Sequence, residues 1–215
     1  MNEYLQAGRY IDSAHPAVVT FAKAKVNGAS ERERAISLYY AVRDEIRYNP
    51  FLDFSRAEAF VASAVLEAGE GFCVGKASLL AAAARAAGIE ARVGFANVKN
   101  HLTSPRLMET MGSDLFVYHG YTELRLDGRW VKATPAFNLA LCKRFRVKPL
   151  EFDGRTDSIF HPFDEDERRH MEYLRDRGSY ADVPVAEIQK AFREAYPRFY
   201  ALGTDAAKES FAPGT

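Results

Sequence analysis

The chain has 215 residues, of which 47% are hydrophobic and 13% aromatic, enough for one buried core. Its 29 Lys and Arg residues balance 29 Asp and Glu residues, so it lacks the basic excess with which proteins bind nucleic acids or anionic membranes. It contains no run of 18 uncharged apolar residues and no signal-peptide pattern, so we expect a cytoplasmic protein that binds neither membranes nor nucleic acids.

The first third of the chain is patterned as helices. An apolar segment over residues 14–26 ends at Asn27-Gly28. Ser30 and Glu33 then form a capping box, which predicts the start of a second helix.

Two more helices are predicted before the pattern changes. Ser55 with Glu58 repeats the start signal, and Gly69 ends the helix that follows. The alanine-rich run 73–87 is a further helix, ended by Gly88, whose small side chains would let it approach a sheet closely.

Strands follow the helices. Residues 89–95 alternate as one face of a strand does, and the polar segment 97–117 is predicted to be a surface loop. Two strands over 119–126 and 129–134 are joined by Asp127-Gly128, a two-residue hairpin signal. Helices first and antiparallel strands second is an α+β order.

The region 139–215 is predicted to be an extension of a single domain over 1–215, whose core lies at about 30–138. A charged helix is expected near 165–177, and a last helix runs from near Pro184 to Tyr196-Pro197. The extension either wraps the core or lines a groove beside the site discussed next, and we favour the first.

The segment around Cys73 carries the strongest chemical signal. A cysteine in the first turn of a helix faces unpaired backbone N–H groups, which favour the thiolate and can stabilise an oxyanion. Gly71 and Phe72 are therefore candidate oxyanion or substrate-binding residues, and glycines at 71 and 75 would let a substrate backbone come close. The alternative is a buried structural thiol.

A nucleophilic cysteine needs a base, and His119 is the best candidate. It begins a predicted strand, where an imidazole has rigid support. The alternative is a half-exposed strand histidine. The weaker candidates lie in turns, in the polar loop or on a charged helix face: His15, His101, His161 and His170.

The sequence resembles the transglutaminase-like superfamily, a papain-fold group that includes bacterial thiol peptidases and amidases. The resemblance covers roughly residues 33–138 and rests on Ile46-Arg47-Tyr48, on GFCVGKASLLAAAARAAGIEARV and on HGYTELRLDGRWVKATPAFN. It implies a papain-like or transglutaminase-like α+β fold, in which a helical N-terminal layer packs on an antiparallel β-sheet and a helical extension follows.

The same resemblance assigns roles to single residues. Cys73 falls on the family's nucleophile and His119 on its general base, while Tyr121 stands where Trp is usual and Glu123 matches a frequent Glu. The third catalytic residue is normally an Asp, but Thr134 occupies its place.

Two residues are candidates to orient the imidazole in place of that Asp. A Thr134 hydroxyl would supply a hydrogen bond without a charge, and Asn138 is the second candidate because Asn has this role in papain-like sites.

Three functions remain open from the sequence. We favour a cysteine hydrolase that cleaves peptides, amides or small acyl compounds through a thioacyl intermediate, because the chain resembles the small bacterial members. An acyltransferase that joins or cyclises acyl groups with amines is the first alternative. A catalytically silent binding module is the second, because the usual Asp is missing.

No metal or cofactor is expected. Cys73, His119 and Cys142 could offer three zinc ligands, but paired CxxC or HExxH spacing is absent. The acidic run 164–167 lacks the glycine turn of a calcium loop. Cys142 is expected to be a core residue of a short helix, with a resolving thiol as the alternative.

Overall fold

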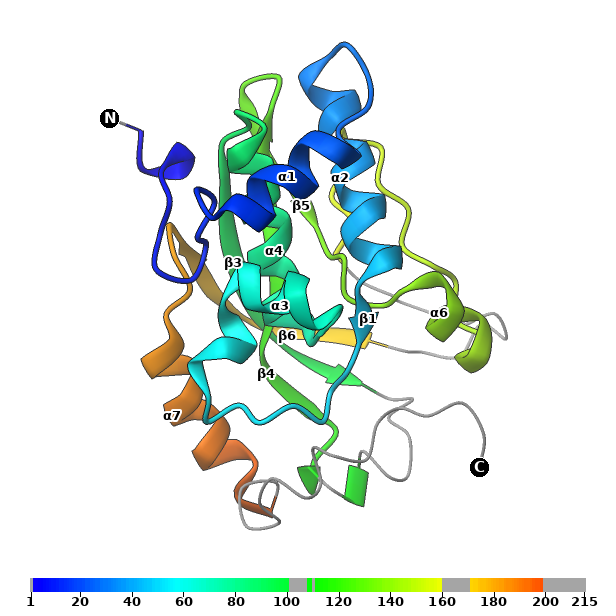
Figure 1. Ribbon diagram of the computed structural model, residues 1–215. Coiled ribbons are helices and arrows are strands. Elements are labelled where there is room, and N and C mark those ends of the chain that lie inside the picture. Colours follow the sequence, from blue (N-terminus) through cyan, green and yellow to red (C-terminus); the bar gives the residue numbers. More distant parts are fainter. Residues whose placement is uncertain (1, 101–107, 110, 160–170, 199–215) are drawn as a thin grey trace.

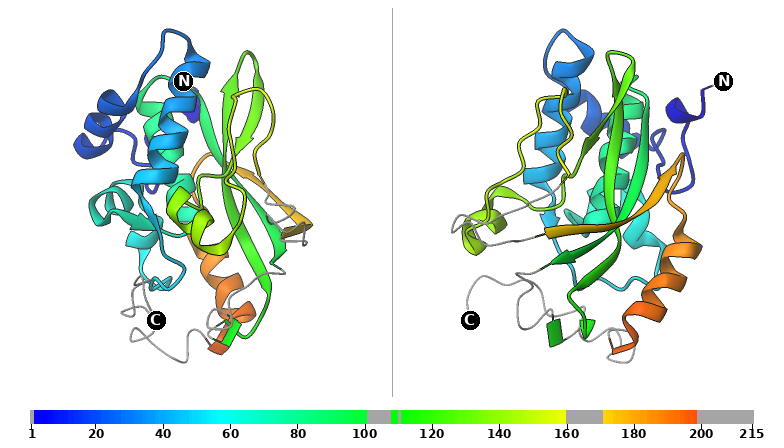
Figure 2. Two further views of the ribbon diagram at one scale, coloured as in Figure 1. Left: turned by 90° about the vertical axis from the view of Figure 1, so that its right-hand side faces the viewer. Right: turned by 180° about the vertical axis from the view of Figure 1, so that it is seen from behind.

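The protein forms two layers, with helices packed on one face of an antiparallel sheet (Figure 1). Figure 2 shows the layers edge-on and the sheet from behind. The computed structural model describes residues 2–100, 108–109, 111–159 and 171–198. The arrangement confirms the predicted α+β class and the helical N-terminal layer.

The N-terminal half supplies the helical layer. In chain order its elements are the 3-10 helix η1 (Glu3–Leu5), helices α1 (Pro16–Lys25) and α2 (Glu31–Glu45), strand β1 (Arg47–Tyr48), the 3-10 helix η2 (Ala57–Phe60), helix α3 (Ala62–Ala68), strand β2 (Glu70–Gly71) and helix α4 (Cys73–Ala86). Strands β1 and β2 pair in parallel, with Tyr48 opposite Gly71.

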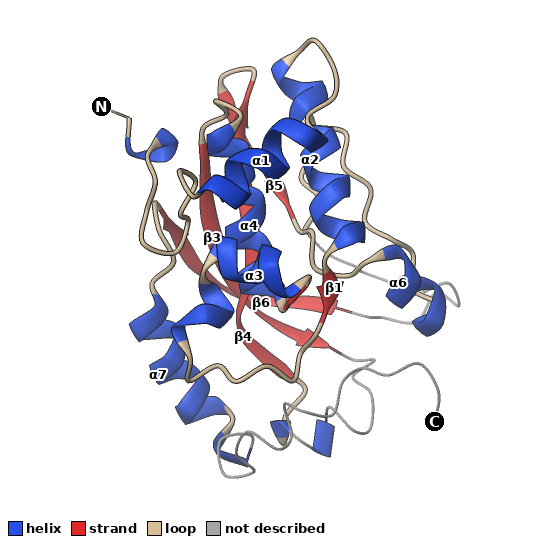
Figure 3. Ribbon diagram, in the orientation of Figure 1, coloured by secondary structure: helices blue, strands red, loops and turns tan. Residues whose placement is uncertain are grey.

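The second half supplies the sheet and two further helices. Its elements are β3 (Ala91–Asn100), β4 (Leu115–Leu126), β5 (Arg129–Ala133), α6 (Leu139–Phe145), β6 (Met171–Tyr180) and α7 (Val185–Ala195). The sheet has the order β5-β4-β3-β6 and every pair is antiparallel. Helix α7 lies beside β4, outside the cluster of α1 to α4 (Figure 3).

Helix α4 is the centre of the molecule. Every residue from Cys73 to Arg85 is buried, because α1, α2 and α3 pack on one side and β3 and β4 on the other. Small side chains bring the α4 backbone close to the sheet, as predicted, and Thr122 Oγ1 donates a hydrogen bond of 2.8 Å to the Ala77 carbonyl. The position of β4 relative to α4 is therefore fixed at backbone distance.

A local signal sets the start of α2, and a tertiary contact holds its end. The capping box is confirmed, since Ser30 Oγ accepts from the Glu33 N–H and the Glu33 carboxylate accepts from the Ser30 N–H. At the other end the fully buried Lys76 Nζ donates to the carbonyls of Arg43 and Ile46, at 2.9 and 2.5 Å. Lys76 thus ties α4 to the end of α2.

The hairpin between β4 and β5 is confirmed. Asp127 and Gly128 have φ values of 50° and 79°, the left-handed pair that a two-residue turn of type I′ requires. Gly69 also ends α3 as predicted, with φ 65°.

The predicted helix start at Ser55 is wrong. Ser55 Oγ donates instead to Asp53 Oδ1 at 2.6 Å, within a turn. The chain then forms the short η2 from Ala57, and α3 begins only at Ala62.

The predicted loop over 97–117 is wrong at both ends. Strand β3 continues to Asn100 and β4 starts at Leu115, while residues 101–107 and 110 lie outside the described residues. The polar Asn97 is buried within β3 because its Oδ1 accepts from the N–H of Tyr118 and from Arg177 Nε. His119 consequently lies inside β4 and not at its start.

The predicted charged helix near 165–177 is wrong over residues 171–177, which belong to strand β6. This strand forms the edge of the sheet beside β3 and exposes most of its side chains, so it lacks apolar alternation. Residues 160–170, with His161, His170 and the acidic run 164–167, lie outside the described residues, as does His101.

The last predicted helix and the buried Cys142 are confirmed. Helix α7 buries Val185, Ile188 and Phe192, and Cys142 is 1% exposed in α6. The region after residue 139 also contributes β6 to the sheet, so its described part packs with the core.

Candidate active site

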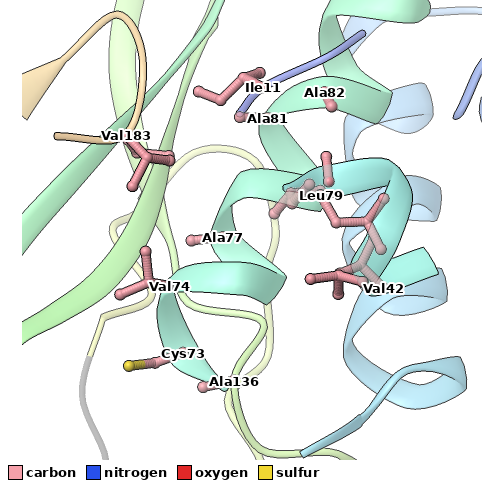
Figure 4. Close-up of a cluster of buried hydrophobic side chains, with 14 of the residues drawn as sticks. Ile11, Val42, Cys73, Val74, Ala77, Leu79, Ala81, Ala82, Ala136 and Val183 are labelled. Atoms are coloured by element: carbon pink, nitrogen blue, oxygen red, sulfur yellow. The ribbon is translucent and has the colours of Figure 1, made fainter. Parts of the chain in front are cut away.

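Cys73 opens α4 at the point where the chain leaves β2. Figure 4 shows its sulfur directed away from the helix. The residue before it, Phe72, is the N-cap of α4 and makes no side-chain capping bond. Because Phe72 cannot accept a hydrogen bond as Ser, Thr or Asp would, the first N–H groups of α4 remain available to a negative charge.

Strand β4 brings His119 to the same place. The two side chains come from residues 46 positions apart in the chain, and both residues line one pocket. Gly120 makes this approach feasible, since a Cβ added there would lie 2.9 Å from the Cα and 3.2 Å from the nitrogen of Val74.

The pocket is small and apolar. Its cavity volume is about 30 Å³, and besides Cys73 and His119 it is lined by Pro50, Met111 and Val117. Six aromatic residues complete the described lining: Tyr48, Phe54, Phe72, Phe116, Phe192 and Tyr196. Two of these, Phe192 and Tyr196, come from α7 and its C-cap, so the extension both packs on the core and lines the pocket.

Burial raises the pKa of Cys73 from 9.0 to about 11, although hydrogen bonds from the backbone N–H groups of Gly120, Val74 and Cys73 lower it in part. The expected net fall in the pKa is therefore wrong. The N–H groups at the start of the helix are present, but a thiol that is only 6% exposed is costly to ionise on its own. A thiolate here needs a nearby group that takes the proton.

Thr134 directly follows β5 and is 3% exposed. Its N–H donates to the Ser158 carbonyl at 2.8 Å, and its Oγ1 donates to the Ile159 carbonyl at 3.4 Å. No hydrogen bond joins Thr134 to Nδ1 of His119 in the described part of the chain. A hydroxyl that donates to a carbonyl keeps its lone pairs as acceptors, so an orienting role stays a prediction.

Tyr121 and Glu123 lie on β4 and do not belong to the described pocket lining. Tyr121 packs with Ala96 and Val98 in a small second cluster. The buried Glu123 pairs with Arg92, its direct neighbour on β3, and the Arg92 guanidinium lies 4.3 Å from the Trp130 ring centroid. These contacts indicate that Glu123 stabilises the sheet.

Gly71 and Gly75 are packed against protein atoms. A Cβ added at Gly71 would lie 2.9 Å from Val65 Cγ1, and one at Gly75 would lie 2.6 Å from the Ala59 carbonyl oxygen. The space that the sequence suggested for a substrate backbone is thus occupied by the protein.

Asn138 supports the pocket wall from outside. Its Oδ1 accepts from the N–H of Tyr48 at 3.3 Å, and the Phe137 ring packs edge-on against the Tyr48 ring. Tyr48 has no local sequence signal for a place in the wall, which follows from the pairing of β1 with β2. An orienting contact from Asn138 to His119 also stays a prediction.

Sequence patterns did not identify Gly120 or the two pocket residues near the C-terminal end of the described chain, Phe192 and Tyr196. Phe192 and Tyr196 are four positions apart, which places them on one face of a helix, but nothing local shows what that face covers. Gly120, between the histidine and the tyrosine of the strand, was a usable signal, because a strand residue without a side chain often marks a close backbone approach.

No group of three His, Cys, Asp or Glu residues that could hold a metal ion occurs among the described residues. Cys142 lies in α6, where its Sγ is 3.8 Å from the Phe137 carbonyl. Over the ranges that the structure describes, no helix is both long and apolar enough to cross a membrane.

Comparison with known proteins relates this arrangement to a family. The sequence model of the transglutaminase-like superfamily matches residues 20–135. A proposed cysteine protease from Cytophaga hutchinsonii has a similar structure, with 16% identity and a TM-score of 0.51 over 85% of this chain and 47% of that one. A proposed protease from Parabacteroides distasonis shows 19% identity and a TM-score of 0.39 over 54% of this chain and 22% of that one.

The chain spans about half the length of the Cytophaga protein, and at this identity the likeness shows a shared fold. No curated protein sequence matches the chain.

Proposed function

Because the chain belongs to the transglutaminase-like superfamily, we propose that it is a cysteine-dependent acyl-transfer enzyme that hydrolyses amide or peptide bonds. Cys73 would be the nucleophile and His119 the general base. The observation that carries the proposal is that these two buried residues, from α4 and β4, line one pocket.

The raised pKa of Cys73 sets how the reaction would begin. A lone thiolate is disfavoured by burial, so the thiol proton passes to the imidazole of His119 as the sulfur attacks the carbonyl carbon. The carbonyl oxygen becomes an oxyanion, which the N–H groups at the start of α4 stabilise.

The remaining steps return each group to its starting state. The tetrahedral intermediate breaks its C–N bond, and the amine leaves with the proton of the imidazolium, which gives a thioester on Cys73. Water then attacks the thioester and gives a proton to His119. The C–S bond breaks, the acid leaves, and the thiol and the neutral imidazole are restored.

Thr134 is the proposed positioning residue, with Asn138 as the second candidate. Thr134 is buried and its hydroxyl direction is set by the Ile159 carbonyl, which supports a fixed acceptor. A neutral acceptor stabilises the imidazolium less than a carboxylate does, so slower chemistry than in a triad with Asp is expected.

The two cysteines provide a matched test of the nucleophile. Both are free, both are buried, and burial raises the pKa of each to about 11, but only Cys73 lines the pocket with His119. At pH 7 we expect iodoacetamide to alkylate Cys73 at least ~10-fold faster than Cys142, with the difference lost in His119→Ala. Equal rates in the unmodified protein would contradict the proposal.

Intact-mass measurement then separates the three functions. Incubation with a panel of amides, esters and thioesters should give an acyl adduct on Cys73 that is absent from Cys73→Ala and retained in Cys142→Ala. Adducts that disappear in water indicate hydrolysis, and interception by an added primary amine indicates acyl transfer. No adduct and no turnover would leave a binding module.

A further inference from the structure

We propose that the pocket beside Cys73 holds the acyl part of the substrate and accepts only short, uncharged acyl groups of about two or three carbons. This inference rests on the proposed function and narrows its substrates from amides and peptides in general to simple amides of short acids. The size limit is set by Phe192 of α7.

The cavity volume gives the size. A buried water molecule needs at least about 10–15 Å³ of such volume, so the cavity of about 30 Å³ has room for about two water molecules. An acetyl group adds three non-hydrogen atoms to the sulfur and a propionyl group adds four, so the smallest acyl groups come nearest to this space. A peptidyl group or a longer chain exceeds this volume and would have to extend beyond the described lining.

The lining gives the polarity. No Asp, Glu, Lys or Arg occurs among the described residues that line the pocket, and most of its side chains are aromatic or aliphatic. A carboxylate or ammonium on the acyl chain would lose its hydration here without gaining an ionic partner from that lining. Uncharged acyl groups avoid this cost.

The aromatic wall of the pocket, formed by Phe54, Phe72, Phe192 and Tyr196, is fixed by ring contacts. The Phe192 ring lies 5.3 Å from that of Phe54, 6.3 Å from that of Phe72 and 5.5 Å from that of Tyr196, and all four residues are buried. A longer acyl chain would have to separate these rings, each of which contributes to the same cluster.

Hydrogen bonds hold both ends of this wall. Gln189 Nε2 donates to the carbonyls of Phe54 and Ser55, each at 3.0 Å. The Tyr196 hydroxyl donates to the Leu115 carbonyl at 2.9 Å and accepts from the Val117 N–H at 2.6 Å. Helix α7 is thereby attached to the 54–55 segment and to β4, and Phe192 lies between the two attachments.

Acylation of Cys73 by p-nitrophenyl esters tests the size limit. Rates for the acetate, propionate and hexanoate esters are measured by intact mass and normalised to their rates with a free thiol in solution. We expect the normalised acetate and propionate rates to exceed the hexanoate rate at least ~10-fold, since the longer chain must displace several ring contacts. In Phe192→Ala the hexanoate rate relative to acetate should rise ~10-fold.

Ile188→Ala is the matched control. It shortens a fully buried side chain one turn earlier on α7, and Ile188 does not belong to the described pocket lining. Its hexanoate-to-acetate ratio should equal that of the unmodified protein. Phe192→Leu replaces Phe192→Ala if the alanine variant does not fold, and a smaller change in the same direction is expected.

The outcomes separate the two proposals. The size limit would be overturned if all three esters gave equal normalised rates. It would also be overturned if the Phe192 variants and Ile188→Ala changed the hexanoate-to-acetate ratio alike. Either result would leave the proposal that Cys73 is the nucleophile standing. Absence both of an acyl adduct on Cys73 and of p-nitrophenol release that Cys73→Ala abolishes would overturn the proposed function and this inference together.

Discussion

Gly120→Ala is expected to separate the two halves of the candidate site. The added Cβ would lie 2.9 Å from the Cα of Val74 and 3.2 Å from its nitrogen. Both atoms belong to the backbone of α4, which is packed on every side, so the contact cannot be relieved by rotating a side chain. Strand β4 must move away from α4, and His119 must move with it.

The size of the effect follows from this geometry. Ordinary contacts between such carbon atoms begin near 3.5 Å, so a displacement of about half an ångström or more is required. Overpacking of this kind costs about 1–3 kcal/mol of unfolding free energy. A misplacement that approaches 1 Å between reacting groups can cost ~100-fold in rate, so activity should fall more than stability.

Two measurements check this reasoning. Urea unfolding gives the change in stability, and the alkylation rate of Cys73 at pH 7 gives the change in the site. Gly88→Ala is the comparison, because Gly88 has a positive φ of 80° but open space around its Cβ position, so it reports backbone strain without a clash. A Gly120→Ala protein with the stability and alkylation rate of the unmodified protein would refute the close approach of β4 to α4.

Substitutions at three further residues test other parts of the structure. Burial lowers the pKa of Lys76 from 10.5 to about 7, so the folded protein loses this proton at a lower pH than the unfolded chain does. The free energy of unfolding should therefore rise between pH 7 and 10.5. In urea unfolding, Lys76→Met should lack that rise. Glu123→Gln leaves Arg92 without its carboxylate and should cost about 1–3 kcal/mol in the same assay. Thr134→Ala should slow alkylation of Cys73 at pH 7, and Thr134→Asp should speed it and shift its pH profile, because a carboxylate stabilises an imidazolium.

Each of these has an outcome that contradicts it. If the free energy of unfolding changed equally with pH in Lys76→Met and in the unmodified protein, this lysine would stay charged when buried. An unchanged unfolding midpoint in Glu123→Gln would show that the pair adds nothing to the sheet. If both Thr134 variants show the Cys73 alkylation rate and pH profile of the unmodified protein, Thr134 does not orient His119.

Elements with complete local signals were predictable from the sequence. The capping box of Ser30 and Glu33 and the Asp127-Gly128 turn each depend on a few neighbouring residues, and both are confirmed. At Ser55 the local signal misleads, because the nearby Asp53 takes the hydroxyl in a turn.

Strand β6 could not be predicted in this way. Its hydrogen bonds go to β3, about 80 residues earlier, and most of its side chains face solvent, so neither composition nor alternation marks it. The polar end of β3 was assigned to a loop for a related reason. Asn97 is buried only because Tyr118 and Arg177, both distant in sequence, supply its hydrogen bonds.

The chemical residues were easier to find than their surroundings. Cys73 and His119 follow from residue type, position and family resemblance, and both line the pocket. The walls formed by Tyr48 and Phe192 depend on tertiary packing. The ionisation of Cys73 was predicted in the wrong direction, because a sequence shows the helix start but not the depth of burial.

The bare start of α4 limits how this protein can be made more heat-resistant. Replacing Phe72 with Ser or Asp is the standard improvement for such a helix, and a good cap adds about 1 kcal/mol. The new side-chain oxygen would compete for the backbone N–H groups that face Cys73. The loss of Phe72 would also remove one ring from the aromatic wall. At this position, engineering for robustness and preserving turnover therefore pull in opposite directions.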